Sequence, residues 1–143
     1  MFCDKLININ ELMSTNSNLN YLDLSYCDIN DVSALGNIHT LILKGCENIT
    51  NVSNLINVSY LDLSECINIA DISALKNVYN LNLTACQSIR SVDMLTNVSI
   101  LNLNQCYNIK NVSNLKHLKT LYIHPYPVEG IEALSHVDII YDY

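Results

Sequence analysis

The sequence repeats itself with a period of about 20 residues, and this periodicity constrains the fold more than any other feature. A Leu-x-Leu pair begins each unit, and successive units begin 20 residues apart, or 19 in the first and last units. The starts are Leu22, Leu41, Leu61, Leu81, Leu101 and Leu121, with a truncated start expected at Ile140. Self-similarity of this kind is typical of a solenoid, in which each unit packs only on its neighbours.

Within a unit the apolar spacing changes from two residues to three. Leu61 and Leu63 show the alternation of a short strand. From Cys66 to Val78 the apolar residues recur every third position, which favours tight turns or short 3₁₀ segments over an α-helix. The phrase at 71–73, an Asx residue followed by Ile or Val and Ser, recurs in other units. Its Asx side chain can accept a hydrogen bond from a free backbone N–H group.

A second polar column stands just before each return into the strand. It consists of Asn37, Asn57, Asn77 and Asn97, continued by His117 and His136. Asparagine tolerates left-handed turn geometry, so we expect turns of that kind at this column. The two histidines are then interpreted as turn residues and not as ligands or catalysts.

The pattern L-x-x-L-x-L-x-x-C-x-x-I-x-D-V-S-x-L resembles the leucine-rich repeat family, in particular its short SDS22-like and internalin-like classes. The unit is shorter than the usual repeat of about 22 residues, and cysteine stands where those classes usually have asparagine. The phrasing also resembles repeat proteins of large DNA viruses and protists. The resemblance implies an α/β fold: a right-handed leucine-rich repeat solenoid with a parallel β-sheet on the concave face and short 3₁₀ or turn segments on the convex face.

Five cysteines occupy one column, and we predict that they form a structural ladder of reduced, metal-free thiols. They are Cys27, Cys46, Cys66, Cys86 and Cys106. Neighbouring strands lie about 4.8 Å apart, whereas a disulfide brings its Cβ atoms to about 3.8 Å and zinc needs ligands that converge on one point. Tyr126, between two prolines, interrupts the column and predicts a changed turn. Cys3 lies outside the column and is the one candidate reactive thiol. No cofactor is expected.

We expect an N-terminal helical cap over residues 1–18 and the solenoid over 19–143. The C-terminal segment ends in an apolar strand fragment, and an exposed strand edge is a template for pairing. Ile139, Tyr141 and Tyr143 are therefore candidates for self-association, so that a homo-oligomer is one of the expected states.

The charge pattern excludes several kinds of partner. The formal net charge is −7, and residues 1–71 carry nine acidic residues against Lys5 and Lys44. The few basic residues are scattered, so no nucleic-acid footprint is expected. The first residues lack a secretory apolar run, and no stretch reaches the roughly 20 apolar residues of a membrane span. With reduced thiols, these features predict an intracellular protein, cytoplasmic or nuclear, that is neither secreted nor bound to a membrane.

No catalytic constellation is apparent, so we expect a non-enzymatic protein whose function lies in its surface. Strand alternation predicts a concave face that binds an unidentified protein partner. The candidate residues are Tyr21, Asp23, Tyr60, Asp62, Ser64, Asn80, Asn82, Thr84, Asn102, Asn104, Tyr122 and His124. Two alternatives stay open: a merely solvated sheet face, and a structural component that assembles through its C-terminal edge.

Overall fold

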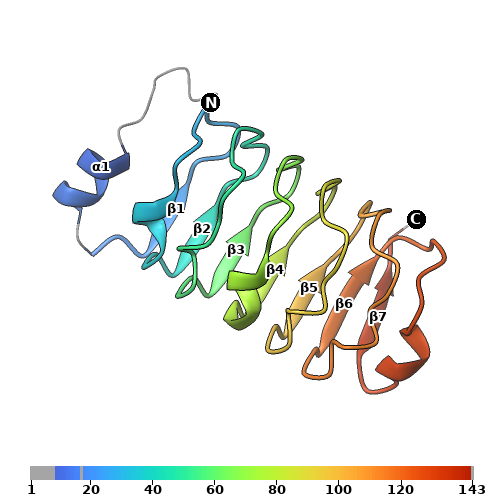
Figure 1. The fold of residues 1–143 in the computed structure, drawn as a ribbon. Helices are drawn as coiled ribbons and strands as arrows, with labels where there is room; N and C mark the ends of the chain where they lie inside the picture. Colours follow the sequence, from blue (N-terminus) through green and yellow to red (C-terminus); the bar gives the residue numbers. More distant parts are fainter. Residues whose placement is uncertain (1–8, 17, 143) are drawn as a thin grey trace.

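The computed structural model describes residues 9–16 and 18–142, which form a solenoid with one short strand in every turn. Seven strands make a single parallel sheet in which the spatial order is the order along the chain. Figure 1 shows them side by side from the N-terminal to the C-terminal end. The strands are β1 (Tyr21–Asp23), β2 (Thr40–Ile42), β3 (Tyr60–Asp62), β4 (Asn80–Asn82), β5 (Ile100–Asn102), β6 (Thr120–Ile123) and β7 (Asp138–Tyr141).

The strand register follows the sequence repeat. Leu41 pairs with Leu61, and Leu61 with Leu81, so equivalent residues of successive units lie next to one another. Leu81 and Leu83 are fully buried, whereas Asn80 and Asn82, which alternate with them, are half-buried on the other side of the sheet. The predicted strands β1 to β6, their faces and the leucine-rich repeat solenoid are therefore confirmed.

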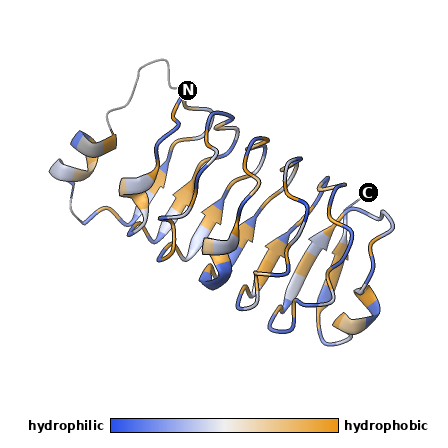
Figure 2. Ribbon diagram, viewed as in Figure 1, coloured by the Kyte–Doolittle hydropathy of each residue, from blue (hydrophilic) through white to orange (hydrophobic). Residues whose placement is uncertain are grey.

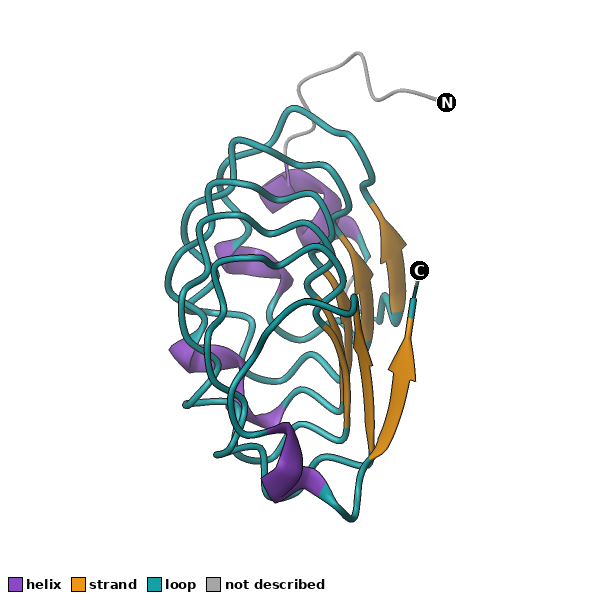
Figure 3. Ribbon diagram, turned by 90° about the vertical axis from the view of Figure 1, so that its right-hand side faces the viewer, coloured by secondary structure: helices purple, strands orange, loops and turns teal. Residues whose placement is uncertain are grey.

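The convex side consists of turns and short 3₁₀ helices, as predicted. The 3₁₀ helices are η1 (Ser33–Leu35), η2 (Ser73–Asn77) and η3 (Ile131–Leu134). Figure 3 shows the sheet along one side of the molecule and the turns along the other. An Asx residue lies just before η1 and η2: the Oδ1 atom of Asp71 accepts a hydrogen bond from the Ser73 N–H at 2.9 Å. Asp31, Asn51 and Asn111 do the same in their units, which confirms the expected turns.

The core is a set of aliphatic columns that run the length of the solenoid. Ile69, Leu75 and Val78 are fully buried, as are their counterparts in the next units. Figure 2 shows apolar and polar segments alternating around each turn, with apolar segments in the strands. Because every unit covers the core of its neighbour, the apolar residues of one turn stabilise the next.

The structure places the five cysteines in one buried column, and Cys66, Cys86 and Cys106 form no disulfide. The Cys66 thiol donates a hydrogen bond to the Leu43 carbonyl oxygen at 3.0 Å, and Cys46, Cys86 and Cys106 bond the equivalent carbonyls at 2.9–3.1 Å. The thiol thus satisfies a buried acceptor at the end of a strand of the preceding turn. Burial raises the pKa of Cys66 to about 12 and that of Cys106 to about 11, and it also raises the pKa of Cys86.

The left-handed backbone positions lie elsewhere than predicted. They immediately precede the cysteine column, at Tyr26, Glu65, Ala85 and Gln105, with φ between 59° and 64°, and at Gly45 with φ of 67°. The prediction for the asparagine column was wrong, because a left-handed residue is needed where the strand turns sharply into the cysteine. The column asparagines instead bond one another across units: Asn57 Nδ2 donates to Asn37 Oδ1, and Asn97 Nδ2 to Asn77 Oδ1.

At the N-terminal end, the helix α1 (Ile9–Thr15) packs beside the first turn. Ile9 is buried and joins the core cluster, and Met13 and Leu19 pack partly buried against it. Cys3 and the other residues of 1–8 lie outside the described part of the chain.

At the C-terminal end, the register of the last strand differs from the expected one. Ile139, and not Ile140, pairs with Leu121. The sixth unit is shorter because one residue is missing after Tyr126 and a second is missing before the strand, where Asp138 alone links Val137 to Ile139. A slip of one residue exchanges the two faces of a strand, so Ile140 lies on the same side as Tyr122.

The sixth unit also has a different turn at the cysteine column. Tyr126 occupies the position of the cysteine and donates its hydroxyl to the Cys106 carbonyl oxygen at 2.8 Å. Burial raises the pKa of this hydroxyl to about 12. The phenol therefore stays protonated at neutral pH and remains a donor to this carbonyl.

Candidate interaction surface

The exposed side of the sheet carries three columns of side chains from the first six units, two columns on the strands and a third just after the strand ends. This side is the concave face of the leucine-rich repeat solenoid. The first column contains Tyr21, Thr40, Tyr60, Asn80, Ile100 and Thr120, the middle one Asp23, Ile42, Asp62, Asn82, Asn102 and Tyr122, and the third Ser25, Lys44, Ser64, Thr84, Asn104 and His124. The predicted binding residues thus share one face of the sheet, but they differ in exposure and in their hydrogen bonds.

Four residues of the middle column end their strands with a side-chain hydrogen bond. The Oδ1 atoms of Asp23, Asp62, Asn82 and Asn102 each accept the backbone N–H of the residue two positions later, at 2.8–3.1 Å. This bond fixes the side-chain direction and satisfies an N–H group at the point where the strand stops. The middle column is therefore a structural feature as well as a surface.

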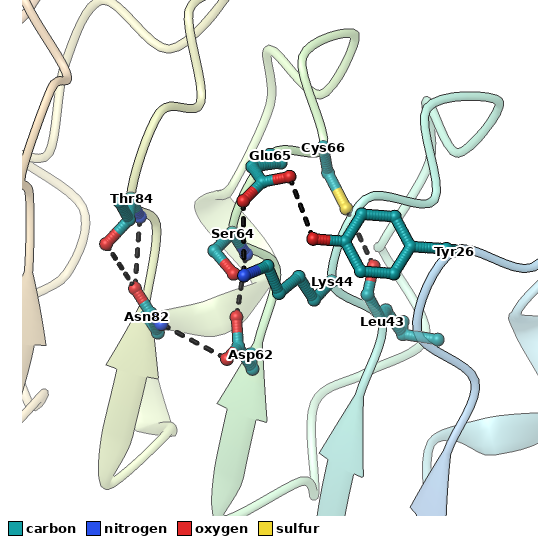
Figure 4. A network of polar contacts seen from close by, with 9 residues as sticks. All are labelled: Tyr26, Leu43, Lys44, Asp62, Ser64, Glu65, Cys66, Asn82 and Thr84. Carbon is teal, nitrogen blue, oxygen red and sulfur yellow. Dashed lines mark hydrogen bonds and ion pairs between the residues drawn. The ribbon is translucent and has the colours of Figure 1, made fainter. Parts of the chain in front are cut away.

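Asn82 is the most constrained residue of this column (Figure 4). Its Nδ2 group donates to Asp62 Oδ2 at 3.1 Å, and its Oδ1 atom accepts both the N–H and the hydroxyl of Thr84, at 3.1 and 2.7 Å. Asn82 is therefore a structural residue as well as a candidate binding residue. It connects β3 with β4 and orients the Asp62 carboxylate.

A second network crosses the turns that follow β1, β2 and β3. Lys44 Nζ lies 3.2 Å from Glu65 Oε1 and 5.7 Å from the centre of the Tyr26 ring. The Tyr26 hydroxyl donates to Glu65 Oε2 at 3.1 Å, as Figure 4 shows. Hydrogen bonds with Tyr26 and then Glu65 raise the pKa of Lys44. The Glu65 carboxylate neutralises the charge of Lys44 locally. The carboxylates of the middle column are not part of this network.

Aromatic side chains gather at the edge where the strands begin. The Tyr60 ring lies 5.3 Å from that of His39 and 5.7 Å from that of Tyr79, measured between ring centres. Tyr21, Tyr60 and Tyr79 remain well exposed. Beside them is a shallow hollow of about 280 Å³. Its lining residues are Thr40, Leu41, Ile42, Tyr60, Leu61, Asp62, Asn80 and Asn82.

Two predicted binding residues are not accessible. Ser64 and Asn104 are buried, so their assignment to the binding surface is corrected. The third column lies just after the strand ends, and its other members, such as Lys44 and Thr84, are half-buried. Asn104 also donates from Nδ2 to Asp142 Oδ2 at 3.0 Å, which ties the fifth unit to the end of the chain.

At the C-terminal part of the face, His124 is held between an aromatic ring and the last described residues. Its Nδ1 atom lies 2.8 Å from the Asp142 carbonyl oxygen. Its ring faces that of Tyr107 edge to face at 6.1 Å, and Tyr107 lies 5.6 Å from Tyr126. Tyr122 is half-buried on the sheet. This region is more internally bonded than the tyrosine-rich region at β1 and β3.

The candidate self-association edge also changes with the register of β7. Ile139 is half-buried and packs against the core, whereas Ile140 and Tyr141 are 43% and 44% exposed. Ile139 therefore packs against the core, and Ile140 lies among the exposed apolar groups. Tyr143 lies outside the described residues.

The described residues contain no group of three or more His, Cys, Asp or Glu side chains that could hold a metal ion. In the same part of the chain, no helix is long and apolar enough to cross a bilayer. The histidines are dispersed: His39 lies beside Thr40, His124 beside Asp142, and His136 Nε2 lies 3.0 Å from the Lys116 carbonyl oxygen.

Fold and columns together define a leucine-rich repeat solenoid. No protein-family model matches the sequence, and no curated protein matches it. The structure is similar to that of an internalin (inlF) from Listeria monocytogenes strain 4b F2365, with a TM-score of 0.52 and 20% sequence identity. The similarity covers 94% of this chain and 49% of the internalin, so this chain spans about half of that protein's length. Solenoids of this kind generally serve as interaction modules.

Proposed function

We propose that this chain is a non-enzymatic protein-binding module that holds its partner on the concave face. The observation that carries the proposal is a group of exposed tyrosines, with Tyr21 and Tyr60 on the sheet and Tyr79 just before β4. Tyrosine offers a large, rigid contact area and a polar tip. On a solenoid surface this composition favours contact with another protein.

The rigidity of the face supports this proposal. At the ends of four strands an Asx side chain accepts a backbone N–H hydrogen bond. The hydrogen bond between Asn82 and Asp62 connects two of these strands. A preorganised surface loses little conformational freedom on association. The hollow beside Tyr60 adds a concave element to which a partner side chain can fit.

The chemistry of the same face favours binding over catalysis. Asp23 and Asp62 each accept a backbone N–H group through Oδ1, and neither has a histidine as its hydrogen-bond partner. His39 and His124 lie in different columns and bond a threonine hydroxyl and a backbone carbonyl, respectively. General acid–base catalysis needs such groups to converge on one reacting atom, and these do not.

Affinity capture with surface variants tests this proposal. Tyr60→Lys and Asn80→Lys, which add charge to the concave face, should abolish capture of a partner from a cell lysate. Met94→Lys, at an exposed convex position, is the matched control and should leave capture intact. All variants should retain the thermal unfolding curve of the parent chain. Loss of capture with the convex variant alone would show that the partner binds the convex side, and it would contradict the proposal.

A second candidate function is assembly through the last strand. Among the described residues, β7 pairs only with β6, and Ile140 and Tyr141 on it are exposed. Sedimentation over a concentration series tests this candidate. It predicts a dimer or larger species that Ile140→Lys converts to monomer, and a strict monomer at high concentration would reject it.

We also propose that the repeats belong to the short internalin-like class in a cysteine-containing form. The recurring Asx turn and the cysteine bond to a strand carbonyl support this assignment. If cysteine replaces asparagine functionally, Cys66→Asn should still unfold in a single cooperative transition. A fully unfolded variant would contradict the equivalence.

Three buried cysteines without a disulfide, Cys66, Cys86 and Cys106, further support an intracellular, cytoplasmic location. A fluorescent fusion expressed in cells would test this location directly. Recovery of the chain from the culture medium would contradict it.

A further inference from the structure

The same five-residue phrase, Tyr-Leu-Asp-Leu-Ser, occurs at 21–25 and at 60–64. Tyr21 and Asp23 lie on β1, and Tyr60 and Asp62 lie on β3. The strand between them, β2, contributes Thr40 and Ile42 to the same face. The concave face therefore carries two copies of a tyrosine–aspartate pair, separated by a strand of different composition.

Each pair presents an aromatic ring beside a carboxylate. Tyr21 is 56% exposed and Tyr60 is 39% exposed. In each pair the aspartate is two residues after the tyrosine, about 6.6 Å along the strand on the same face. A cationic side chain can reach both groups, and a guanidinium can stack on the ring while it bonds the carboxylate. The chemistry of each pair thus favours arginine.

The carboxylates are held in place before any partner arrives. Asp23 Oδ1 accepts the Ser25 N–H at 2.9 Å and its hydroxyl at 2.6 Å. The hydrogen bond from the Ser25 hydroxyl, which has the larger effect, and that from the Ser25 N–H lower the pKa of Asp23. The Asp23 carboxylate is therefore ionised at neutral pH. Asp62 is fixed by the Ser64 N–H and by Asn82. A carboxylate has about four acceptor positions, so each can accept further hydrogen bonds.

The surrounding charge also favours a cationic partner. Residues 1–71 carry nine acidic residues and two lysines. Within the three described columns, Lys44 is the only Lys or Arg, and Glu65 already pairs with it. The two tyrosine–aspartate pairs are thus not neutralised by a basic residue of their own face.

The distance between the pairs indicates the conformation of the partner. Two strand spacings amount to about 9.6 Å. A polyproline II segment rises about 3.1 Å per residue and returns to the same side every third residue, after about 9.3 Å. A β-strand returns to the same side every second residue, after about 6.8 Å, and this distance does not match the separation of the two pairs. Polyproline II segments also dock commonly on aromatic surfaces.

We propose that these twin pairs bind an extended protein segment in polyproline II conformation, with one arginine at the Tyr21–Asp23 pair and a second arginine, three residues away, at the Tyr60–Asp62 pair. The residues between the arginines lie over Ile42, which is half-buried and apolar. This inference rests on the proposed function and specifies the chemical class of the partner.

Fluorescence anisotropy with labelled proline-rich peptides tests the proposal on the full chain. The probes carry two arginines three residues apart, two arginines two residues apart, or two glutamates three residues apart. The first should bind saturably, with affinity that falls as salt rises, and more tightly than the second. The glutamate peptide should not bind.

The chain itself supplies variants that keep the fold. Asp23→Asn with Asp62→Asn introduces the residue found natively at Asn82 and Asn102, which makes the same turn bond. Together the two changes should weaken binding about tenfold, since each removes an exposed ion pair. Tyr21→Thr with Tyr60→Thr uses the residue native at Thr40 and should also weaken binding.

Asp71→Asn is the matched control. It removes one negative charge from the convex side and copies the native turn at Asn51, so binding should be unchanged. Equal binding of both arginine spacings, or unchanged affinity in the double aspartate variant, would overturn the proposal. Capture of a lysate partner that still depends on Asn80, with no peptide binding, would leave the proposed function standing and reject this inference alone.

Discussion

From β2 to β6 the interior of the sheet presents the same leucine at the same register, whereas the first exposed column changes in almost every strand. The interior reads Leu41, Leu61, Leu81, Leu101 and Leu121, and the exposed column reads Thr40, Tyr60, Asn80, Ile100 and Thr120. An interior residue contacts its own copies above and below, so a single shape must pack with itself. An exposed residue meets solvent or a partner and is free of that requirement. The difference separates the columns that stabilise the solenoid from the columns that can recognise something.

The largest expected effect tests the interior half of this comparison. Leu83→Ala should lower the free energy of unfolding by about 2–5 kcal/mol, because it leaves a cavity in a fully buried column. Urea unfolding followed by circular dichroism measures the change. A loss below that found for a change on the exposed face would invert the assignment of the two faces.

A smaller effect is expected at the cysteine column. Cys86→Ala should cost about 1–3 kcal/mol, because the Leu63 carbonyl oxygen loses the thiol donor and stays buried. The same unfolding experiment applies. Cys86→Ser restores a donor and should recover part of the loss, and a serine variant no better than alanine would show that the hydrogen bond is unimportant.

The thiols should also make stability depend on pH. An unfolded cysteine ionises near pH 9.0, whereas burial raises the pKa of Cys66 to about 12 in the folded protein. The folded state therefore binds the proton more tightly, and the free energy of unfolding should fall as pH rises from 9 toward 12. At pH 10 the loss should be about 1 kcal/mol for each such thiol. Chemical unfolding at pH 7 to 10 checks this, and Cys66→Ala should flatten the decline.

A comparison of two asparagines, which includes the smallest expected effect, distinguishes structural from solvent-facing residues within the exposed face. Asn82→Ala should cost about 1–2 kcal/mol, because its hydrogen bonds to Asp62 and Thr84 are lost. Asn80→Ala, in the neighbouring column, should change stability by less than about 0.5 kcal/mol. Thermal unfolding of both variants makes the comparison. Equal losses would show that the first column is structural as well.

Most of the fold could be predicted because the repeat carries the same information several times. The leucine starts, the aliphatic core and the Asx turns at Asp71 and its equivalents follow from spacing and side-chain chemistry. The last strand was placed one residue late, because the missing residue before Ile139 shows only when backbone pairing is known. The left-handed positions were also misplaced, since Tyr26 and Glu65 carry no local signal for that geometry.

The candidate surface was predictable only as a set of columns. Strand alternation placed the residues on one face, but it did not show that Ser64 and Asn104 are covered by neighbouring turns. It also did not distinguish Asn82, which joins two strands, from Asn80. Such differences depend on contacts about 20 residues apart along the chain, and a local pattern does not contain them.

The sequence by itself determined the solenoid, the identity of its interior columns and the sidedness of its strands, because a 20-residue period can bury its leucines in only one continuous core. The tertiary structure decided which polar residues of the exposed face are used internally. It also decided that the two tyrosine–aspartate pairs lie on alternate strands with a shared orientation. The physical reason is that these properties arise from hydrogen bonds and packing between successive turns, and they exist only once the turns are stacked.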